Sequence, residues 1–194
     1  MKMVDELKIL EKRMANRYME DGIWDIYLGL MAFAFGFGIV LDISYLAAIM
    51  VSVGFAFQSI AKNMITFPRI GYIKLRKAKK RGMAAVLTGV LFLGMMIFLV
   101  FMLGDENPVR YFVRDRMLFF IAVIWGGAIA LAGLSFHVRR YFAYALIVFG
   151  AVMMSEWMGS LGLNLIGAGL LVMIAGLFVM MRFIRKYPIT PQQN

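Results

Sequence analysis

The sequence predicts an all-α, polytopic membrane protein with six transmembrane helices and an N-terminal amphipathic helix on the membrane surface. Three observations lead to this fold class. Of the 194 residues, 62% are hydrophobic and 16% are charged, whereas soluble domains have about half apolar and about a quarter charged residues. The apolar residues form long uncharged runs, and the lysines and arginines gather between alternate runs.

The first 22 residues hold five cations and five acids. Apolar residues recur within this segment at spacings of three and four, namely Met3, Leu7, Leu10, Met14 and Tyr18. This spacing predicts an amphipathic helix over residues 3–20, lying on the cytoplasmic surface or against a partner. The apolar run that follows is about 19 residues long, too long for a typical signal peptide, so we expect the chain to be uncleaved.

The first long apolar run, residues 26–61, carries a single charge, Asp42. As one straight helix its 36 residues would extend about 54 Å at ~1.5 Å per residue, against a hydrocarbon core of roughly 30 Å. The run must therefore fold back, and Asp42 marks the turn. Two spans are expected here, at about 23–41 and 43–61, joined by a short outer turn.

A second run of the same kind covers residues 141–181, with Glu156 as its single charge and Gly159 close by. It predicts another tight hairpin, with spans at about 141–158 and 161–181. The two hairpins then share one pattern, a long apolar run with a single acidic residue near its turn, although the identities of their residues do not establish a repeat.

Two further uncharged runs lie between the hairpins, at 83–103 and 117–136, separated by the turn-forming segment GDENPVRYFVRDR. They form a central pair that the hairpins flank. The transmembrane domain is thus expected over 23–182, and the polar segment 183–194 forms a C-terminal tail.

The distribution of charge tests the number of spans. With six spans, one side of the membrane takes the N-terminus, the basic loop 62–82, the link 137–140 and the residues after Met181. These segments hold 18 of the 21 lysines and arginines, and the other side holds three. The positive-inside rule therefore predicts a multi-pass protein of the plasma membrane with both termini in the cytoplasm.

The stretch FPRIGYIKLRKAKKRG, residues 67–82, holds seven of these cations. Its first expected role is to fix the topology. Cations next to a span also attract anionic lipid head groups, at roughly 1 kcal/mol each. The candidate contacts to such lipids or to a protein partner are Arg69, Tyr72, Lys74, Arg76, Lys77, Lys79, Lys80 and Arg81. Nucleic acid is not an expected partner, because the topology already explains the charge.

Small residues predict where helices pack closely. Glycines recur every seven residues in the last span, at Gly162, Gly169 and Gly176. Ala32 and Gly36 form a second such pair in the first span. These faces suit contacts within the chain or within a homo-oligomer.

An ionisable residue inside a membrane is costly and is a functional candidate for that reason. Asp25 lies near the start of the first span, where an ion pair or the helix N-terminus would stabilise it. The basic residues expected near it are Lys62, His137, Arg139 and Arg140. Asp42 and Glu156 are expected at the outer turns, either solvated or together binding a cationic ligand. The remaining candidate polar residues are His137 and Asn164.

Enzyme chemistry is not expected. The chain has no cysteine and one histidine, which excludes disulfides, thiolate chemistry and a multi-histidine metal site within one chain. No catalytic, cofactor-binding or metal-ligating residue is predicted. The stretch EDGIWDIYLG is superficially similar to the opening of the CDP-alcohol phosphotransferase motif, but the downstream residues of that motif are absent.

Three short motifs, DGIWDIYLG (21–29), PRIGYIK (68–74) and FIRKYP (183–188), support a resemblance. The chain resembles uncharacterised small prokaryotic integral membrane proteins that have a D-G-x-W-D start, a P-R-x-G-Y loop and a basic-Tyr-Pro close. The resemblance implies a prokaryotic six-span membrane protein and supplies no role.

The functional hypothesis is a non-catalytic accessory, assembly or sensing subunit, acting through the basic loop and the helix 3–20. The alternative is a small transporter or channel for an ion or small solute, with a path between the two hairpins. No proline interrupts a span, so the broken helices that build many transport sites are not expected. A membrane-embedded enzyme is the third hypothesis.

Overall fold

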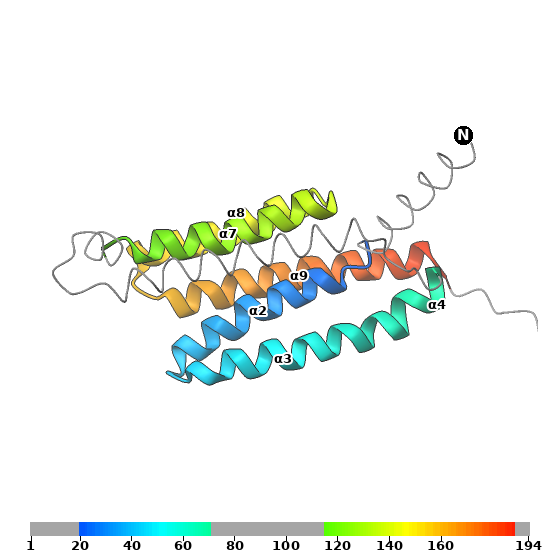
Figure 1. The fold of residues 1–194 in the computed structure, drawn as a ribbon, viewed down its shortest axis with the longest axis horizontal. Helices are drawn as coiled ribbons and strands as arrows, with labels where there is room; N and C mark the ends of the chain where they lie inside the picture. The colour runs from blue at the N-terminus through cyan, green and yellow to red at the C-terminus, as the bar shows by residue number, and fades with distance from the viewer. Residues whose placement is uncertain (1–19, 71–114, 189–194) are drawn as a thin grey trace, which may run out of the picture. The chain divides into compact units, whose positions relative to one another are not determined.

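The computed structural model describes residues 20–70 and 115–188, and within these ranges every regular element is helical (Figure 1). The elements are α2 (Ile23–Val40), α3 (Ser44–Ala61), the π-helix η1 (Lys62–Thr66), α4 (Phe67–Ile70), α7 (Met117–Phe136), α8 (Arg140–Met158) and α9 (Leu161–Lys186). The prediction of an all-α chain is confirmed for these residues. The expected surface helix 3–20 and the expected span 83–103 lie outside them.

Four helices of the described ranges are long and apolar enough to cross a membrane, namely α2, α7, α8 and α9. Large apolar side chains on them are exposed, such as Leu146, Trp157 and Phe178, as expected for helices whose outer faces contact lipid. The chain therefore has the character of a membrane protein. The total of six spans stays a prediction.

The chain divides into two compact units. In the described residues the first unit contains 20–70 and 166–188, and the second contains 115–165. Helix α9 begins in the second unit and continues into the first.

In the first unit, α2 and α9 contact each other backbone to backbone. A methyl group added at Gly29 would lie 2.6 Å from the backbone nitrogen of Met173, and one at Gly169 would lie 2.5 Å from that of Phe33. Gly22 meets Gly176 in the same way, so the two helices run antiparallel. The predicted packing role of Gly169 and Gly176 is seen here, and only glycine fits at these contacts.

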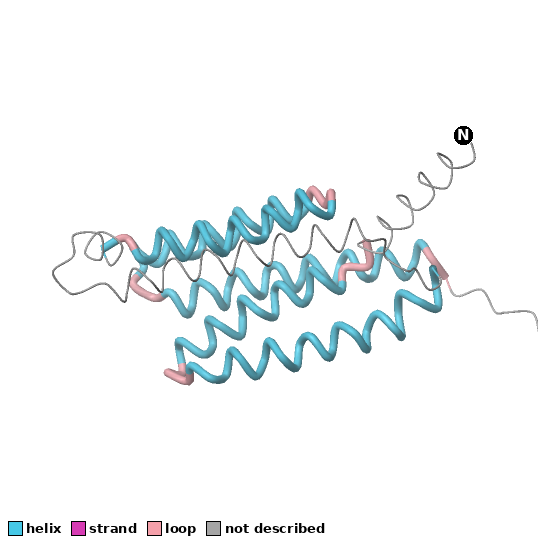
Figure 2. The backbone as a smooth tube through the Cα atoms, in the orientation of Figure 1, coloured by secondary structure: helices cyan, strands magenta, loops and turns pink. Residues whose placement is uncertain are grey.

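Helices α2 and α3 form a hairpin, and the chain turns between them at Asp42 (Figure 2). Asp42 has a left-handed conformation, with φ of 56°, which Asp tolerates better than most residues. The N–H of Ile43 donates to the carbonyl oxygen of Gly38 at 2.9 Å. This bond is typical of a Schellman motif, which ends a helix by satisfying its last carbonyls.

The second unit is built on the hairpin of α7 and α8, which turns by the same motif. His137 has φ of 56°, and the N–H of Val138 donates to the carbonyl oxygen of Gly133 at 3.0 Å. The core of the unit is apolar and contains Ala122, Val152 and Leu165. Hydrophobic burial of this kind stabilises the hairpin.

Candidate functional site

The first unit buries a cluster of charged and polar side chains at the start of α2. Asp21 and Asp25 are both 0% exposed, and their spacing of four places them on one face of the chain as it enters the helix. The Oδ1 atom of Asp21 accepts a hydrogen bond from the N–H of Ile23 at 3.2 Å. Asp21 therefore satisfies one of the free donors that every helix has at its N-terminus, where the helix dipole also favours a carboxylate.

Two donors from the end of the α2–α3 hairpin reach the other oxygen of Asp21. The ammonium group of Lys62 lies 2.9 Å from Oδ2, and the hydroxyl of Thr66 donates to the same atom at 2.8 Å. Lys62 is 4% exposed and Thr66 is fully buried. The Asp21 carboxylate thus joins two parts of the chain that lie 41 and 45 residues apart.

Both donors lie in the π-helix η1, where Lys62 is the first residue and Thr66 the last. A π-helix is rare and occurs mostly as a single turn within an α-helix, often at a functional site. The wider turn here coincides with the residues that hold Asp21.

Burial lowers the pKa of the Lys62 ammonium, because leaving water disfavours its charged form. The charges of Asp21 and Asp25, with the hydrogen bond to Asp21, oppose this change and raise the pKa. Asp25 is thus an electrostatic partner of Lys62. The cluster of Asp21, Asp25, Lys62 and Thr66 is called the charge cluster below.

The charge cluster continues along α3 as a polar face. Gly54, Gln58, Lys62 and Thr66 follow at intervals of four, and all are buried. Gln58 is 5% exposed. On the facing helix, the indole nitrogen of Trp24 is buried as well. The α2–α3 interface therefore has buried polar atoms over several turns.

The structure places the predicted site residues in different surroundings. Asp25 lies in the charge cluster with Lys62, one of the four basic residues expected near it. His137, Arg139 and Arg140 belong to the second unit. Lys62, the first residue of the predicted basic loop 62–82, has its side chain buried in the hairpin.

Asp42 and Glu156 are both exposed, and they belong to different units. His137 is exposed at the α7–α8 turn, and Asn164 is partly buried on α9. Arg69 in α4 donates to the carbonyl oxygen of Ile65 at 2.7 Å. The other candidate lipid contacts, Tyr72, Lys74, Arg76, Lys77, Lys79, Lys80 and Arg81, lie outside the described residues.

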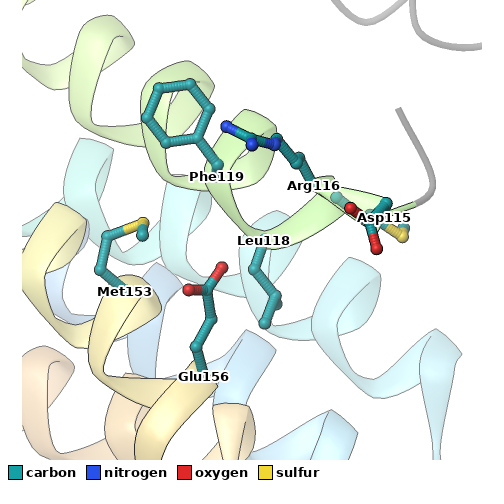
Figure 3. A pocket seen from close by; sticks show the side chains of 7 residues that line it. Asp115, Arg116, Leu118, Phe119, Met153 and Glu156 are labelled. Atoms are coloured by element: carbon teal, nitrogen blue, oxygen red, sulfur yellow. The ribbon is translucent and has the colours of Figure 1, made fainter. Parts of the chain in front are cut away.

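Glu156 lines a pocket of about 610 Å³ in the second unit. Its carboxylate points between Met153 and Leu118 (Figure 3). Asp115 and Arg116 also line this pocket, together with apolar side chains.

Sequence reasoning missed Asp21, Thr66 and Gln58. Asp21 was assigned to the surface segment and Thr66 to the basic loop, so the boundary of the apolar run separated both from Asp25. The sequence did contain an indication of this cluster. Asp21 and Asp25 are four residues apart, and so are successive members of the set Gln58, Lys62 and Thr66.

Comparison with protein-family models, with curated proteins and with solved structures gives no match.

Proposed function

We propose that this chain is a six-span protein of the plasma membrane, with both termini in the cytoplasm, and that it works as a non-catalytic accessory, assembly or sensing subunit. One observation carries the proposal: the buried Asp21 carboxylate is bonded to both Lys62 and Thr66. Asp21 follows directly on the predicted surface helix 3–20, and Thr66 directly precedes the basic stretch 67–82.

The charge cluster thus anchors both proposed contact segments at one point of the first hairpin. A protein partner or an anionic lipid surface that acts on one segment also acts on the other through this point. The Asp21 carboxylate accepts three hydrogen bonds from its own chain. A carboxylate held in this way is better suited to positioning other parts of the chain than to taking part in a catalytic cycle.

The topology is tested by labelling single cysteines in intact cells, for which the absence of natural cysteine gives a clean background. Asp42→Cys and Glu156→Cys should react with an impermeant maleimide from outside. Lys77→Cys and Gln192→Cys should react only after the membrane is permeabilised. Labelling of Asp42→Cys and Glu156→Cys from opposite sides would contradict the proposed arrangement.

The accessory role is tested by purifying the tagged chain from native membranes in a mild detergent. A partner protein should be recovered in a fixed ratio with the natural chain. It should be lost when Lys77, Lys79, Lys80 and Arg81 are replaced by Gln, while the melting temperature stays unchanged. Recovery of the natural chain alone, or of the same partner with both chains, would overturn the role proposed for the basic loop.

A second candidate function, the transport of an ion or small solute, is favoured by the buried polar face of α3 and by Asp25 beside it. In proteoliposomes, Asp25→Asn should abolish flux without lowering the melting temperature if Asp25 serves transport. If Asp25 has only a structural role, the same variant should melt earlier, and the natural chain should show no flux.

A further inference from the structure

The interface between α2 and α3 contains a hydrogen-bond donor and an acceptor that lack partners among the described residues. The donor is the indole N–H of Trp24 and the acceptor is the amide oxygen Oε1 of Gln58. Both atoms are buried, and the whole Gln58 side chain is 5% exposed. The large majority of buried side-chain polar atoms in proteins have a hydrogen-bond partner, so these two atoms require an explanation.

The register of the two helices places Trp24 and Gln58 at the same level. At one end Lys62 is bonded to Asp21. Toward the turn, Gly54 lies against the ring of Tyr27. A methyl group added at Gly54 would lie 3.0 Å from a ring carbon of Tyr27. Gln58 lies midway between Gly54 and Lys62 on the same face of α3. Because the helices are antiparallel, it is level with the middle of the Asp21–Tyr27 segment, where Trp24 lies.

Ring contacts fix the position of the Trp24 side chain at this level of the interface. The indole of Trp24 packs edge to face with the ring of Tyr27, with centroids 6.0 Å apart and an interplanar angle of 75°. The Tyr27 ring in turn covers Gly54. The rings of Trp24 and Tyr27 therefore flank this level of the interface on the side of the turn, and the Lys62–Asp21 ion pair flanks it on the other side.

The chemistry of the two atoms limits what can lie between them. The occupant must accept a hydrogen bond from the indole N–H and donate one to the amide oxygen. A bare metal cation cannot accept, and a simple anion cannot donate. A water molecule does both, and it is the smallest group that does so.

We propose that Trp24 and Gln58 bind one buried water molecule at the α2–α3 interface. The water accepts from Nε1 of Trp24 and donates to Oε1 of Gln58. Its remaining lone pair and hydrogen extend the polar face one turn beyond the charge cluster. The proposal does not depend on the proposed function, because it uses only the polar atoms and the register of the hairpin.

The test is NMR of the full-length protein in detergent micelles, with ¹⁵N-labelled indoles. The chain has three tryptophans, and Trp24→Phe assigns the signal of Trp24. Its indole proton should show a cross-peak to water that arises from dipolar contact with a slowly exchanging molecule. Trp157, which is 92% exposed, is the internal control and should show no cross-peak to a slowly exchanging water.

The variant Gln58→Met should remove or strongly weaken the dipolar cross-peak of Trp24 while leaving the signals of the other two indoles in place. Absence of such a cross-peak at all three indoles of the natural chain would overturn the proposal, and this result needs no variant to fold. A contact from the Trp24 indole proton to the Gln58 amide instead of water would also overturn it, by showing a direct hydrogen bond. An undiminished water cross-peak in Gln58→Met would exclude Gln58 as a ligand and overturn the proposed pair.

Discussion

The two units turn their hairpins by the same motif but pack their helices differently. In the first unit, methyl groups added at Gly29 or Gly169 would lie 2.5–2.7 Å from backbone atoms of the facing helix. In the second, the nearest atoms to methyl groups at Gly126 or Gly133 are 3.0–3.3 Å away and include side-chain carbons. The α2–α9 contact of the first unit therefore admits only glycine, whereas the α7–α8 contact of the second unit is side-chain packing that has some freedom to adjust.

The polar residues follow the same division. The first unit buries Asp21, Asp25, Gln58, Lys62 and Thr66. The described part of the second unit buries the hydroxyls of Ser155 and Tyr141 and the Nε atom of Arg140, but no whole charged residue. Ser155 bonds to the carbonyl oxygen of Val152 in its own helix. Asp21, Asp25 and Lys62 are at most 4% exposed, and in that setting each charge needs its partner more strongly. The first unit should therefore be the more sensitive one to substitution.

The largest effect is expected for Lys62→Met, which removes the cation and leaves the Asp21 carboxylate buried. Removing one partner of a buried ion pair costs about 3–5 kcal/mol of unfolding free energy. Thermal unfolding of the purified protein in one detergent measures the loss. The matched control is Lys186→Met, because Lys186 is 59% exposed and lies 3.8 Å from Glu20. Exposed pairs of this kind contribute at most about 1 kcal/mol, so equal losses in both variants would refute the assigned role of Lys62.

Gly169→Ala should have the next largest effect, because its methyl group would meet the backbone nitrogen of Phe33 and the carbonyl oxygen of Gly29. Overpacking of this kind costs about 1–3 kcal/mol, and rigid backbone neighbours favour the upper end. Gly167, on the same helix, has no atom within 4 Å of an added methyl group. Gly167→Ala should leave the melting temperature unchanged or raise it, since Ala favours helix by up to about 1 kcal/mol. Similar melting temperatures for the two variants would show that α2 and α9 do not touch in this way.

Gly126→Ala tests the packing of a glycine in the second unit in the same way. Its methyl group would lie 3.3 Å from the carbonyl oxygen of Ala145 and from the Cβ atom of Phe149. A shift of a few tenths of an ångström relieves such a contact, so we expect a loss of about 1 kcal/mol, at the low end of overpacking. A loss as large as that of Gly169→Ala, measured in the same unfolding assay, would remove the distinction between the two units.

The helices could be predicted from the sequence to within a few residues, because long apolar runs broken by a charged or glycine-containing turn leave few alternatives. The predicted range 117–136 coincides with α7, and 23–41 exceeds α2 by one residue. On α9 the glycine spacing indicated a packing face. The partner face on α2, where Gly22 and Gly29 are also seven residues apart, needed the structure, since spacing alone does not say which helices meet.

The charge cluster was only half predictable. Asp25 stood out because a carboxylate inside an apolar run is costly. Asp21 and Lys62 lie just beyond the ends of their runs, where hydropathy treats charges as solvated. Their contact joins residues 41 positions apart, and it depends on the register of the α2–α3 hairpin, which no single run of sequence contains.

The smallest effect expected is a dependence of stability on pH. It shows whether burial or the neighbouring carboxylates have the larger influence on the pKa of Lys62. Burial lowers its pKa below the ordinary value of 10.5, while Asp21 and Asp25 on α2 oppose this change. Since these influences partly cancel, the net effect should be smaller than that of removing the side chain.

The sign follows from the protons bound in each state. Between the lowered pKa and 10.5, the unfolded chain keeps a proton on Lys62 that the folded chain has released. The unfolded state binds more protons in this window, so the free energy of unfolding should rise as the pH rises toward 10.5. Unfolding curves of the natural chain and of Lys62→Met, taken at matched pH values, isolate this contribution as their difference, and Lys186→Met should follow the natural chain. A difference that falls with pH would mean that the ion pair with Asp21 outweighs burial and raises the pKa of Lys62, and the charge cluster would then be held mainly by its charges.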